Sequence, residues 1–391
     1  MTAHPAAVHG HVVHTHAHRR FVRIERFLVD RLLLLPVSVL VALVWANTAS
    51  ESYFEFARRL SFPVNEIGMA FFFALLAQEI VEAVMPGGAL HSWRRWTMPI
   101  VAAVGGAAGA VSAYLLYVQL SYEAPLLQAW PIACAIDAAA TYYVVKAIMP
   151  RTGALPFALL VAIVTDIIGA LVVAPQRPVL QTHAGGAALM TAALLLAVSM
   201  RAMKIRVFWP YLFVCGTISW VAFYWEGLHP AFALVPIVPF LPHEPRRLDL
   251  FADPRDDDAV HHAEREWHLI VKIVVFLFGL VNAGVILKGY DTGSWAMLAA
   301  QLVGRPIGLL VAVALAIAAG LHLPRHLGWR ELLVIALATS SGFAIALFFA
   351  TGMLAPGPML AQIKIGLLLS ASGALLAFAA AWILKVGRFA S

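Results

Sequence analysis

The stretch ALLVAIVTDIIGALVV, residues 158–173, decides how this chain folds and where its function is to be sought. All of its residues are apolar or glycine except Thr165 and Asp166, which are adjacent at its centre. A carboxylate in the middle of a membrane-spanning helix costs about 3 kcal/mol or more, and such residues mark ion or proton pathways. Asp166 is therefore the first candidate functional residue. The competing interpretation is a structural carboxylate that a neighbouring helix satisfies.

The composition indicates a membrane protein. The chain has 391 residues, of which 62% are hydrophobic and only 12% charged, whereas soluble domains carry about 25% charged residues. Apolar runs of nearly twenty residues recur from Leu32 to Leu384, which predicts an all-α polytopic protein with one membrane domain over 23–388. The basic residues are scattered, so no nucleic-acid partner is expected. Cys134 and Cys215 each lie alone in an apolar run, which disfavours a disulfide or a zinc site.

We expect twelve membrane spans, and hence both termini on the same side. The predicted spans cover residues 31–47, 63–85, 96–119, 126–149, 155–174, 183–201, 206–225, 228–241, 268–288, 295–319, 331–352 and 361–385. Most Lys and Arg residues between the spans fall on the side of the termini. The opposite side receives only Arg58, Arg59, Arg177 and Lys288. Positive charge is enriched on the cytoplasmic side of membrane proteins, so both termini are predicted to be cytoplasmic.

Two segments outside the spans have unusual compositions. Residues 1–22 are rich in histidine, and we expect a disordered cytoplasmic tail, with metal binding as the alternative. The long loop 242–267 holds Asp256, Asp257 and Asp258 beside two histidines. We expect a solvated cytoplasmic loop there, with a divalent-cation or pH-sensing role as the alternative.

A few ionisable residues remain inside the predicted spans. Asp137 lies in AWPIACAIDAAATYY on span four, Asp166 on span five and Arg305 in LVGRPIGLL on span ten. Glu79 and Glu82 lie towards the cytoplasmic end of span two. Three lysines inside spans are expected to extend their long side chains to the interface: Lys146, Lys272 and Lys364. Two carboxylates and a guanidinium at mid-span are typical of an ion pathway or a proton relay.

Two spans also carry helix-breaking signals. Pro131 precedes Asp137 in span four, and Thr-Ser-Ser-Gly at 339–342 interrupts span eleven. A broken helix exposes backbone groups, which a membrane tolerates only where they are buried in protein or line a cavity. The exposed helix ends carry partial charges that a nearby ion can compensate. We expect Asp137 to compensate positive helix ends and Arg305 negative ones.

From Arg23 onward the chain resembles the bacterial NhaA family of sodium/proton antiporters. The resemblance rests on the order and spacing of many short motifs along the chain. These motifs are IERFL, LVWAN, FFFALLAQEI, PIVAAVGG, WPIACAIDAA, LLVAIVTDIIGALVV, GLHPAFALVPIVPFLP, NAGVIL, GRPIGLL and SSGFAIALFFAT. It implies inverted repeats with two discontinuous helices, an architecture for which NhaA is a standard example.

The resemblance also assigns roles to the ionisable residues. The span-four carboxylate of the family falls on Asp137, which is therefore a candidate cation- and proton-binding residue as well as a candidate for charge compensation. The adjacent aspartate pair of span five reads Thr165-Asp166 here, so the second aspartate, which binds the cation or the proton, is kept as Asp166. The first aspartate is replaced by Thr165, whose hydroxyl oxygen can add a ligand to a hard cation such as Na⁺. The span-ten lysine falls on Arg305.

The pH-sensing residues of the family are only partly present. The glutamate that begins the sensor falls on Glu79, and the charged residues that follow it read Val81, Glu82 and Ala83 here. The histidine before span eight matches His229. Glu79, Glu82 and His229 are therefore the candidates for pH sensing, and a steep alkaline activation is not expected.

We expect a secondary antiporter of the bacterial inner membrane that exchanges Na⁺ or Li⁺ for protons and is not an enzyme. Thr165 cannot titrate and Arg305 keeps its proton, so Asp166 alone changes charge in each cycle unless Asp137 also titrates, and a single titrating carboxylate predicts electroneutral exchange. The expected partners are a monovalent cation, protons and the bilayer, with a homodimer left open and no resident cofactor. One alternative is a transporter of the same fold for another ion or solute. The remote alternative is an intramembrane aspartyl protease that uses Asp137 and Asp166.

Overall fold

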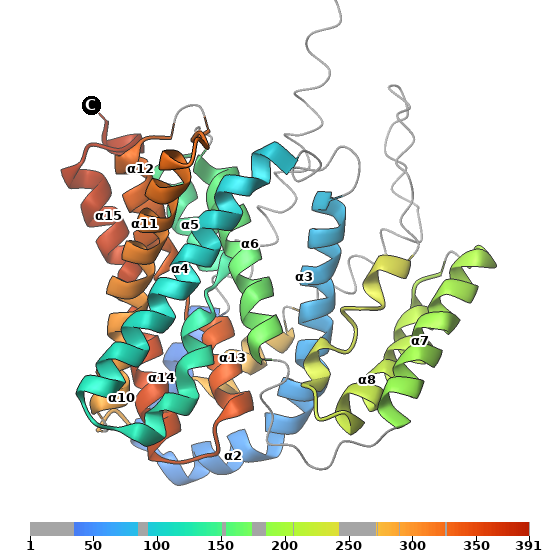
Figure 1. Ribbon diagram of the computed structural model, residues 1–391. Coiled ribbons are helices and arrows are strands. Elements are labelled where there is room, and N and C mark those ends of the chain that lie inside the picture. Colours follow the sequence, from blue (N-terminus) through green and yellow to red (C-terminus); the bar gives the residue numbers. More distant parts are fainter. Residues whose placement is uncertain are drawn as a thin grey trace, which may run out of the picture.

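The structure, a computed structural model, is helical, and the residues that it describes contain no strand (Figure 1). The described residues are 35–84, 93–150, 154–173, 185–205, 207–241, 271, 273–288, 290–324 and 327–390. The expected N-terminal tail 1–22 and cytoplasmic loop 242–267 lie outside these residues. The all-α polytopic fold predicted from the apolar runs is confirmed.

Every predicted span except the eighth contains α-helix. The helices before the eighth span are Leu35–Thr48, α2 Ser50–Phe62, α3 Met69–Val84, α4 Trp93–Leu120, α5 Ala138–Ile148, α6 Ala154–Val173, α7 Gly185–Ala202 and α8 Gly216–Trp225. Those after it are Ile273–Asn282, α10 Thr292–Ala299, α11 Arg305–Ala318, α12 Trp329–Thr339, α13 Ala344–Met353, α14 Pro358–Ser370 and α15 Ser372–Ile383. The π-helical turns are η1 Pro63–Gly68, η3 Tyr211–Cys215 and η6 Ala300–Gly304. The 3₁₀ segments are η2 Ala124–Cys134, η4 Pro230–Phe232, η5 Val238–Phe240 and η7 Gly387–Phe389.

Several of these helices suit a bilayer by length and composition. Among the described residues, four are long and apolar enough to cross it: Thr97–Leu120, Gly185–Ala202, Thr292–Ala318 and Pro358–Phe389. Helices α12 and α13 together form a further span that bends by 42° at its break. The shorter apolar helices are Leu35–Thr48, Phe157–Val173, Tyr211–Trp225 and Ile273–Asn282.

The predicted eighth span, 228–241, is wrong as an α-helix. It consists of η4 and η5, joined by turns. Proline lacks a backbone N–H and its ring collides with the carbonyl four residues earlier, so it interrupts an α-helix. The segment holds Pro230, Pro236 and Pro239 within ten residues of one another, which leaves no room for a regular helix of two turns.

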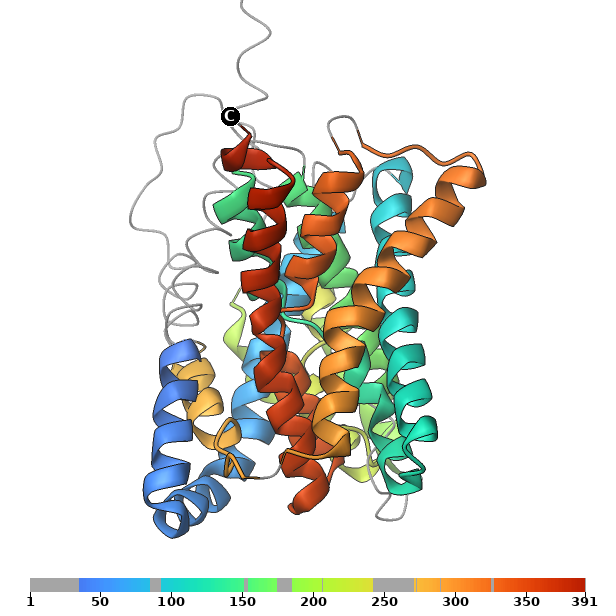
Figure 2. The same ribbon diagram turned by 90° about the vertical axis from the view of Figure 1, so that its left-hand side faces the viewer.

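The membrane domain contains two three-span units that run in opposite directions. The first consists of α4, the broken span η2–α5, and α6; the second consists of α10–η6–α11, the broken span α12–α13, and α14–α15. Figures 1 and 2 show α4 and α10–α11 side by side and antiparallel, so the second unit is inverted relative to the first. The pattern of intact, broken and intact spans recurs, as expected for inverted repeats.

Four glycines let α4 and α11 touch along their backbones. Gly105 and Gly109 of α4 face Gly304 and Gly308, and both pairs have the spacing of a small-xxx-small motif. A Cβ on Gly109 would lie 2.3 Å from the carbonyl oxygen of Gly304 and 2.6 Å from Cα of Gly308. Because these neighbours are backbone atoms, α4 and α11 form a closely packed pair that carries Arg305 at its centre.

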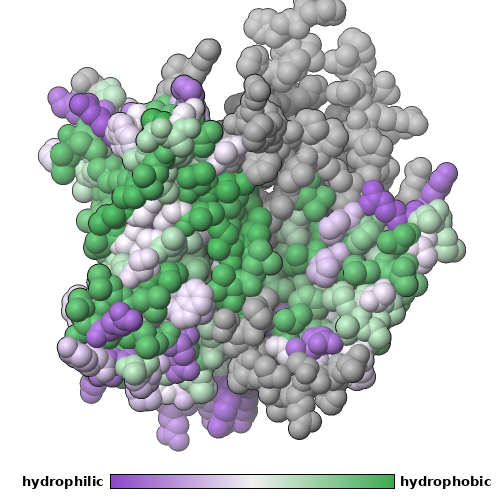
Figure 3. All heavy atoms as spheres, viewed as in Figure 1, coloured by the Kyte–Doolittle hydropathy of each residue, from purple (hydrophilic) through white to green (hydrophobic). Residues whose placement is uncertain are grey.

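Apolar side chains cover the middle of the face shown in Figure 3, and hydrophilic ones gather towards its two ends. Residues of the α4–α11 pair contribute to the exposed apolar surface. Val104, Leu116, Val311 and Leu315 are each more than half exposed. Large exposed apolar surfaces mark contact with a membrane or a partner, and here they accompany helices of membrane-spanning length.

The glycine contact between α4 and α11 predicts that two neighbouring glycine-to-alanine substitutions differ in their effect on the free energy of unfolding. Gly109→Ala places a methyl group on backbone atoms and should lower stability by about 1–3 kcal/mol. Gly106→Ala is the matched control, because a Cβ there would lie 3.6 Å from its nearest neighbour, an ordinary contact. Since alanine favours helix over glycine, this control should be neutral or stabilising. Thermal unfolding of the detergent-solubilised variants measures both, and equal melting temperatures would contradict the close contact.

Candidate functional site

The two broken spans cross at their breaks. In span four, η2 ends at Cys134, residues 135–137 are non-helical, and α5 begins at Ala138. In span eleven, α12 ends at Thr339 and α13 begins at Ala344. A Cβ on Gly342 would lie 2.0 Å from the backbone nitrogen of Asp137 and 2.7 Å from the carbonyl carbon of Ile136. The breaks are therefore in direct contact, and only glycine fits at position 342.

Asp137 lies at the N-terminus of α5. Its Oδ1 accepts a hydrogen bond from the backbone N–H of Ala140 at 3.1 Å, the geometry of an N-cap, and the residue is only 6% exposed. The N-terminus of a helix carries a partial positive charge, which a carboxylate at this position stabilises. The position thus agrees with the role expected for Asp137 at a positive helix end.

Arg305 contacts the opposite kind of helix end. It is 1% exposed, and its Nη2 donates to the carbonyl oxygens of Ala133 at 2.6 Å and Ala135 at 2.8 Å. Its Nε donates to Oε1 of Gln301 at 2.8 Å. The two carbonyls belong to the C-terminal end of η2, where a helix carries partial negative charge. Arg305 therefore lies at a negative end of the break, as expected.

Hydroxyl groups satisfy the end of the other broken span. Thr339 and Ser340 donate to the carbonyl oxygen of Ala336, and Ser341 donates to that of Ala338 at 2.7 Å. These bonds run back to the last turn of α12, the usual pattern for Ser and Thr near a helix end. The Thr-Ser-Ser-Gly sequence thus breaks the helix and also supplies donors for the carbonyls that the break exposes.

Helix α6 brings Asp166 and Thr165 to the crossing. Both are buried, at 3% and 1% exposure. One turn further along α6, a Cβ on Gly169 would lie 3.6 Å from Cα of Ala135, so this part of α6 runs beside the break in span four. Arg305 binds the carbonyl oxygen of the same Ala135 at 2.8 Å. Asp166 and Arg305 therefore both lie beside the break in span four, residues 135–137.

The hydroxyl of Thr165 is bonded within its own helix. It donates to the carbonyl oxygen of Val161 at 2.7 Å. Because the donated hydrogen points along the helix, the lone pairs of the hydroxyl oxygen stay available as acceptors. A hydroxyl held in this way can still serve as a neutral oxygen ligand for a cation.

Of the three predicted pH-sensing residues, the structure describes the side-chain contacts of His229. Nδ1 of the buried His229 lies 3.5 Å from Oε2 of Glu66 on η1 and accepts a hydrogen bond from the backbone N–H of Ala231 at 3.4 Å. Glu79 and Glu82 belong to the last turns of α3, and their side chains lie outside the described part of the structure. Glu79 is thirteen residues beyond Glu66 along η1 and α3, which is roughly 20 Å of helix.

Two residues were missed or misjudged from the sequence. Glu66 was overlooked, although a carboxylate in the first turn of an apolar span is a signal of function. The expectation that Lys364 reaches the membrane interface is wrong, because the residue is only 9% exposed on α14. Lys146 is partly buried, and Lys272 lies outside the described residues.

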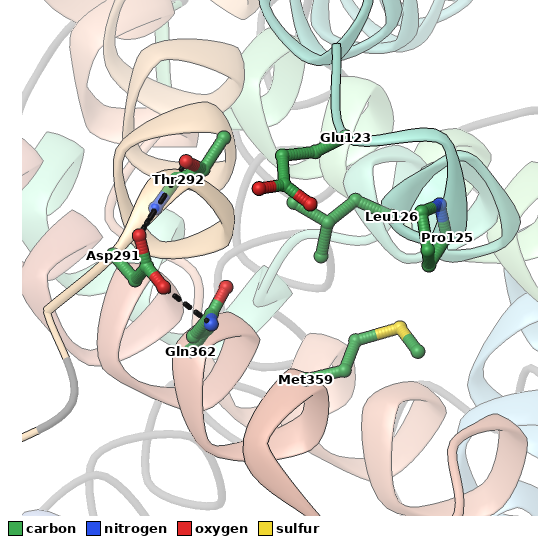
Figure 4. Close-up of a pocket in the computed structure, with 7 residues that line it drawn as sticks. All are labelled: Glu123, Pro125, Leu126, Asp291, Thr292, Met359 and Gln362. Carbon is green, nitrogen blue, oxygen red and sulfur yellow. Dashed lines mark hydrogen bonds between the residues drawn. The ribbon is translucent and has the colours of Figure 1, made fainter. Parts of the chain in front are cut away.

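A separate pocket of about 150 Å³ lies away from these groups. It is lined by Glu123, Pro125, Leu126, Asp291, Thr292, Met359 and Gln362 (Figure 4). Asp291 accepts from the backbone N–H of Thr292 at 2.8 Å and from Nε2 of Gln362 at 3.1 Å, so it caps α10 and ties it to α14. Among the described residues, no three His, Cys, Asp or Glu side chains gather into a metal-binding group.

Comparison with known proteins finds relatives over nearly the whole chain. Residues 21–384 match the family described as Na+/H+ antiporter 1. The chain is 36% identical to the Na(+)/H(+) antiporter NhaA of Desulfitobacterium hafniense, over 93% of this chain and 96% of the relative. It is 35% identical to the NhaA protein of Geotalea uraniireducens, over 90% and 95% of the two chains. Among solved structures, the sodium proton antiporter MjNhaP1 from Methanocaldococcus jannaschii shares the fold with a TM-score of 0.54 and 17% identity, over 90% and 91% of the two chains.

Proposed function

This chain belongs to the Na+/H+ antiporter 1 family, and we propose that it is a secondary antiporter that exchanges Na⁺ or Li⁺ for protons across the bacterial inner membrane. The observation that carries the proposal is the buried carboxylate of Asp166 on α6, beside the crossing of two broken helices. The predicted multi-pass membrane protein of this family is confirmed by the family match and the apolar helices.

In the proposed mechanism, Asp166 binds either a cation or a proton, so the two compete for one carboxylate. A hard monovalent cation prefers oxygen ligands. Asp166 and the lone pairs of the Thr165 hydroxyl supply such oxygens, while Asp137 stabilises the positive end of α5. Alternating access would come from one helix group moving against the other around this site.

The proposed orientation places both termini in the cytoplasm. It rests on the excess of Lys and Arg on the side of the termini. A reporter domain fused after Ser391 shows on which side of the membrane the C-terminus lies. A signal from outside the cytoplasm would reverse the proposed orientation.

A second candidate is a transporter of the same fold for another ion or solute. The observation that favours it is Thr165, which stands where the related antiporters carry the first aspartate of a pair. Counterflow measurements with a panel of cations and anions in sealed vesicles separate the two candidates. Stimulation of proton movement by Na⁺ or Li⁺ alone supports the first candidate.

The central prediction concerns two aspartates with different proposed roles. Asp166→Asn removes the carboxylate for which cation and proton are proposed to compete, so exchange should fall to the rate of empty proteoliposomes. Asp137→Asn keeps an oxygen that accepts from Ala140, so it should reduce exchange without abolishing it. Internal pH during a Na⁺ pulse measures both variants. Wild-type rates in Asp166→Asn would sink the mechanism, and equal loss in both would remove the division of roles.

We also propose that His229 and Glu66 form a pH-sensitive contact. Nδ1 of His229 faces a backbone donor and a carboxylate, and it can accept from Ala231 only when deprotonated. When protonated, Nδ1–H can donate to Glu66 instead. Protonation of Nδ1 therefore changes its partner from the Ala231 N–H to the Glu66 carboxylate.

His229→Gln should therefore alter the pH dependence of exchange. A glutamine amide does not gain or lose a proton in this pH range, so the pH of half-maximal rate should move by about half a unit or more. His322→Gln is the matched control, because His322 is exposed and lies on the segment after α11. Rates measured from pH 5.5 to 8.5 would contradict the proposal if the two variants gave superimposable profiles.

We predict that exchange is electroneutral. One carboxylate that trades one proton for one monovalent cation moves no net charge. The exchange rate of proteoliposomes should therefore be the same at zero and at −100 mV, set with potassium and valinomycin. Moving one net charge would instead couple to about 2.3 kcal/mol per 100 mV, and a marked acceleration would show that a second group titrates.

Variants of Thr165 test the origin of this behaviour. Thr165→Asp restores a second carboxylate, so an active variant should become sensitive to membrane potential. Thr165→Ser keeps the hydroxyl without adding charge and should stay insensitive. An active Thr165→Asp protein that ignores the potential would show that this position does not set the charge moved in each cycle.

A further inference from the structure

Gln301 is a buried polar residue beside Arg305, and the proposed exchange mechanism does not use it. It is 0% exposed and lies on η6, one turn before Arg305. Its Oε1 accepts from Nε of Arg305 at 2.8 Å. Its Nε2 points to the carbonyl oxygens of Ala133 and Ala135, each at 3.4 Å. Gln301 and Arg305 therefore donate hydrogen bonds to the same two carbonyl oxygens and are hydrogen-bonded to each other.

The chemistry of the two side chains fixes this arrangement. A guanidinium has only donors, so the amide oxygen of Gln301 has to face Nε, and the amide nitrogen then faces the carbonyls. A bond at Nε and two bonds at Nη2 hold the planar guanidinium in one orientation. All of these acceptors are neutral oxygens, so they hold the charge in place without neutralising it.

Asp166 is the competing acceptor for the same guanidinium. Asp166 lies one turn before Gly169 on α6, and a Cβ on Gly169 would lie 3.6 Å from Cα of Ala135, whose carbonyl oxygen Arg305 binds. An arginine that lost its acceptor at Nε inside this apolar bundle would leave a buried donor unsatisfied, which drives the side chain towards another acceptor. A carboxylate attracts a guanidinium more strongly than a neutral oxygen does.

We propose that Gln301 is a positioning residue of the transport site: it holds the Arg305 guanidinium on the carbonyls of Ala133 and Ala135, so that the guanidinium does not compete with the transported cation for Asp166. This inference rests on the proposed exchange function and deepens it. If the inference holds, Gln301 determines the affinity of the site for the transported cation and does not determine the amount of folded protein.

The test measures the Na⁺ and Li⁺ dependence of exchange in proteoliposomes at fixed pH. Gln301→Met keeps the length and volume of the side chain but removes the amide. Gln301→Asn keeps an amide that is one methylene too short to reach Nε. Each should raise the apparent KM by about three- to ten-fold, the factor that corresponds to one hydrogen bond. The maximal rate should stay within about two-fold, and either variant suffices if the other does not fold.

Gln301→Glu provides the rescue, because its carboxylate again accepts from Nε. Its KM should lie closer to that of the wild type than the KM of Gln301→Met. Gln119→Leu is the control, since Gln119 is exposed at the end of α4, and it should behave as wild type. A fall in maximal rate or in yield with unchanged KM in Met and Asn variants would show a merely structural role and overturn the inference.

The experiment separates this inference from the proposed function. If the wild type moves no protons in response to Na⁺ or Li⁺, the exchange function itself fails. If the wild type exchanges and Asp166→Asn does not, but KM is unaffected by Gln301→Met, the function stands and the role of Gln301 is refuted. A raised KM that Gln301→Glu restores supports both.

Discussion

The backbone ends that two broken helices expose inside an apolar bundle are the constraint on which the rest of this structure depends. Bilayer interiors offer no water to satisfy free N–H and C=O groups, so irregular backbone survives there only when protein groups satisfy it. Here Asp137 caps α5 and Arg305 binds the carbonyls of Ala133 and Ala135. The hydroxyls of Thr339–Ser341 serve the end of α12. The sign of the helix end decides between acceptor and donor: a carboxylate accepts at the positive end of α5, and a guanidinium and hydroxyls donate at the negative ends of η2 and α12.

This arrangement also explains how the buried carboxylate of Asp166 is accommodated beside the crossing. A lone charge in an apolar helix is costly, but the break already gathers a guanidinium, a carboxylate and several backbone dipoles. Asp166 enters this polar region on the intact helix α6. Gly169 and Gly342 keep the neighbouring backbones close enough for these groups to interact. The polar groups that satisfy the breaks thus also lower the cost of a charge that the function requires.

Much of the fold and part of the candidate site could be predicted from the sequence, for identifiable reasons. Apolar runs are long and charges within them rare, so the spans and the residues Asp137, Asp166 and Arg305 were evident. Pro131 and the Thr-Ser-Ser-Gly stretch located the breaks. The eighth span differs from its prediction because its hydrophobicity is that of a spanning helix while its prolines prevent one. It was predicted as a helix, although Pro230, Pro236 and Pro239 exclude a regular one.

The partners of these residues could not be predicted in the same way. The contact of His229 with Glu66 joins residues far apart in sequence, and nothing local in the sequence pairs them. Gln301 carries no charge, so it did not stand out in a search for ionisable groups. Its importance depends on Arg305 lying one turn away and on the carbonyls of a different span. Tertiary hydrogen bonds of neutral side chains are the part of such a site that only a structure reveals.

Thr165, Gln301 and Arg305 form a consistent set when their charges are considered together. Where the resemblance to the NhaA family implies an aspartate, Thr165 contributes a neutral hydroxyl that is satisfied within its own helix. A positive charge at position 305 then lacks that carboxylate as a counter-ion, and it needs neutral acceptors arranged around it. A guanidinium suits this task better than an ammonium, because its planar donors reach Gln301 and two carbonyls at once. With the neutral Thr165 in this position, a guanidinium fits at position 305 better than an ammonium does. The neutral Gln301 then has to hold that guanidinium in place.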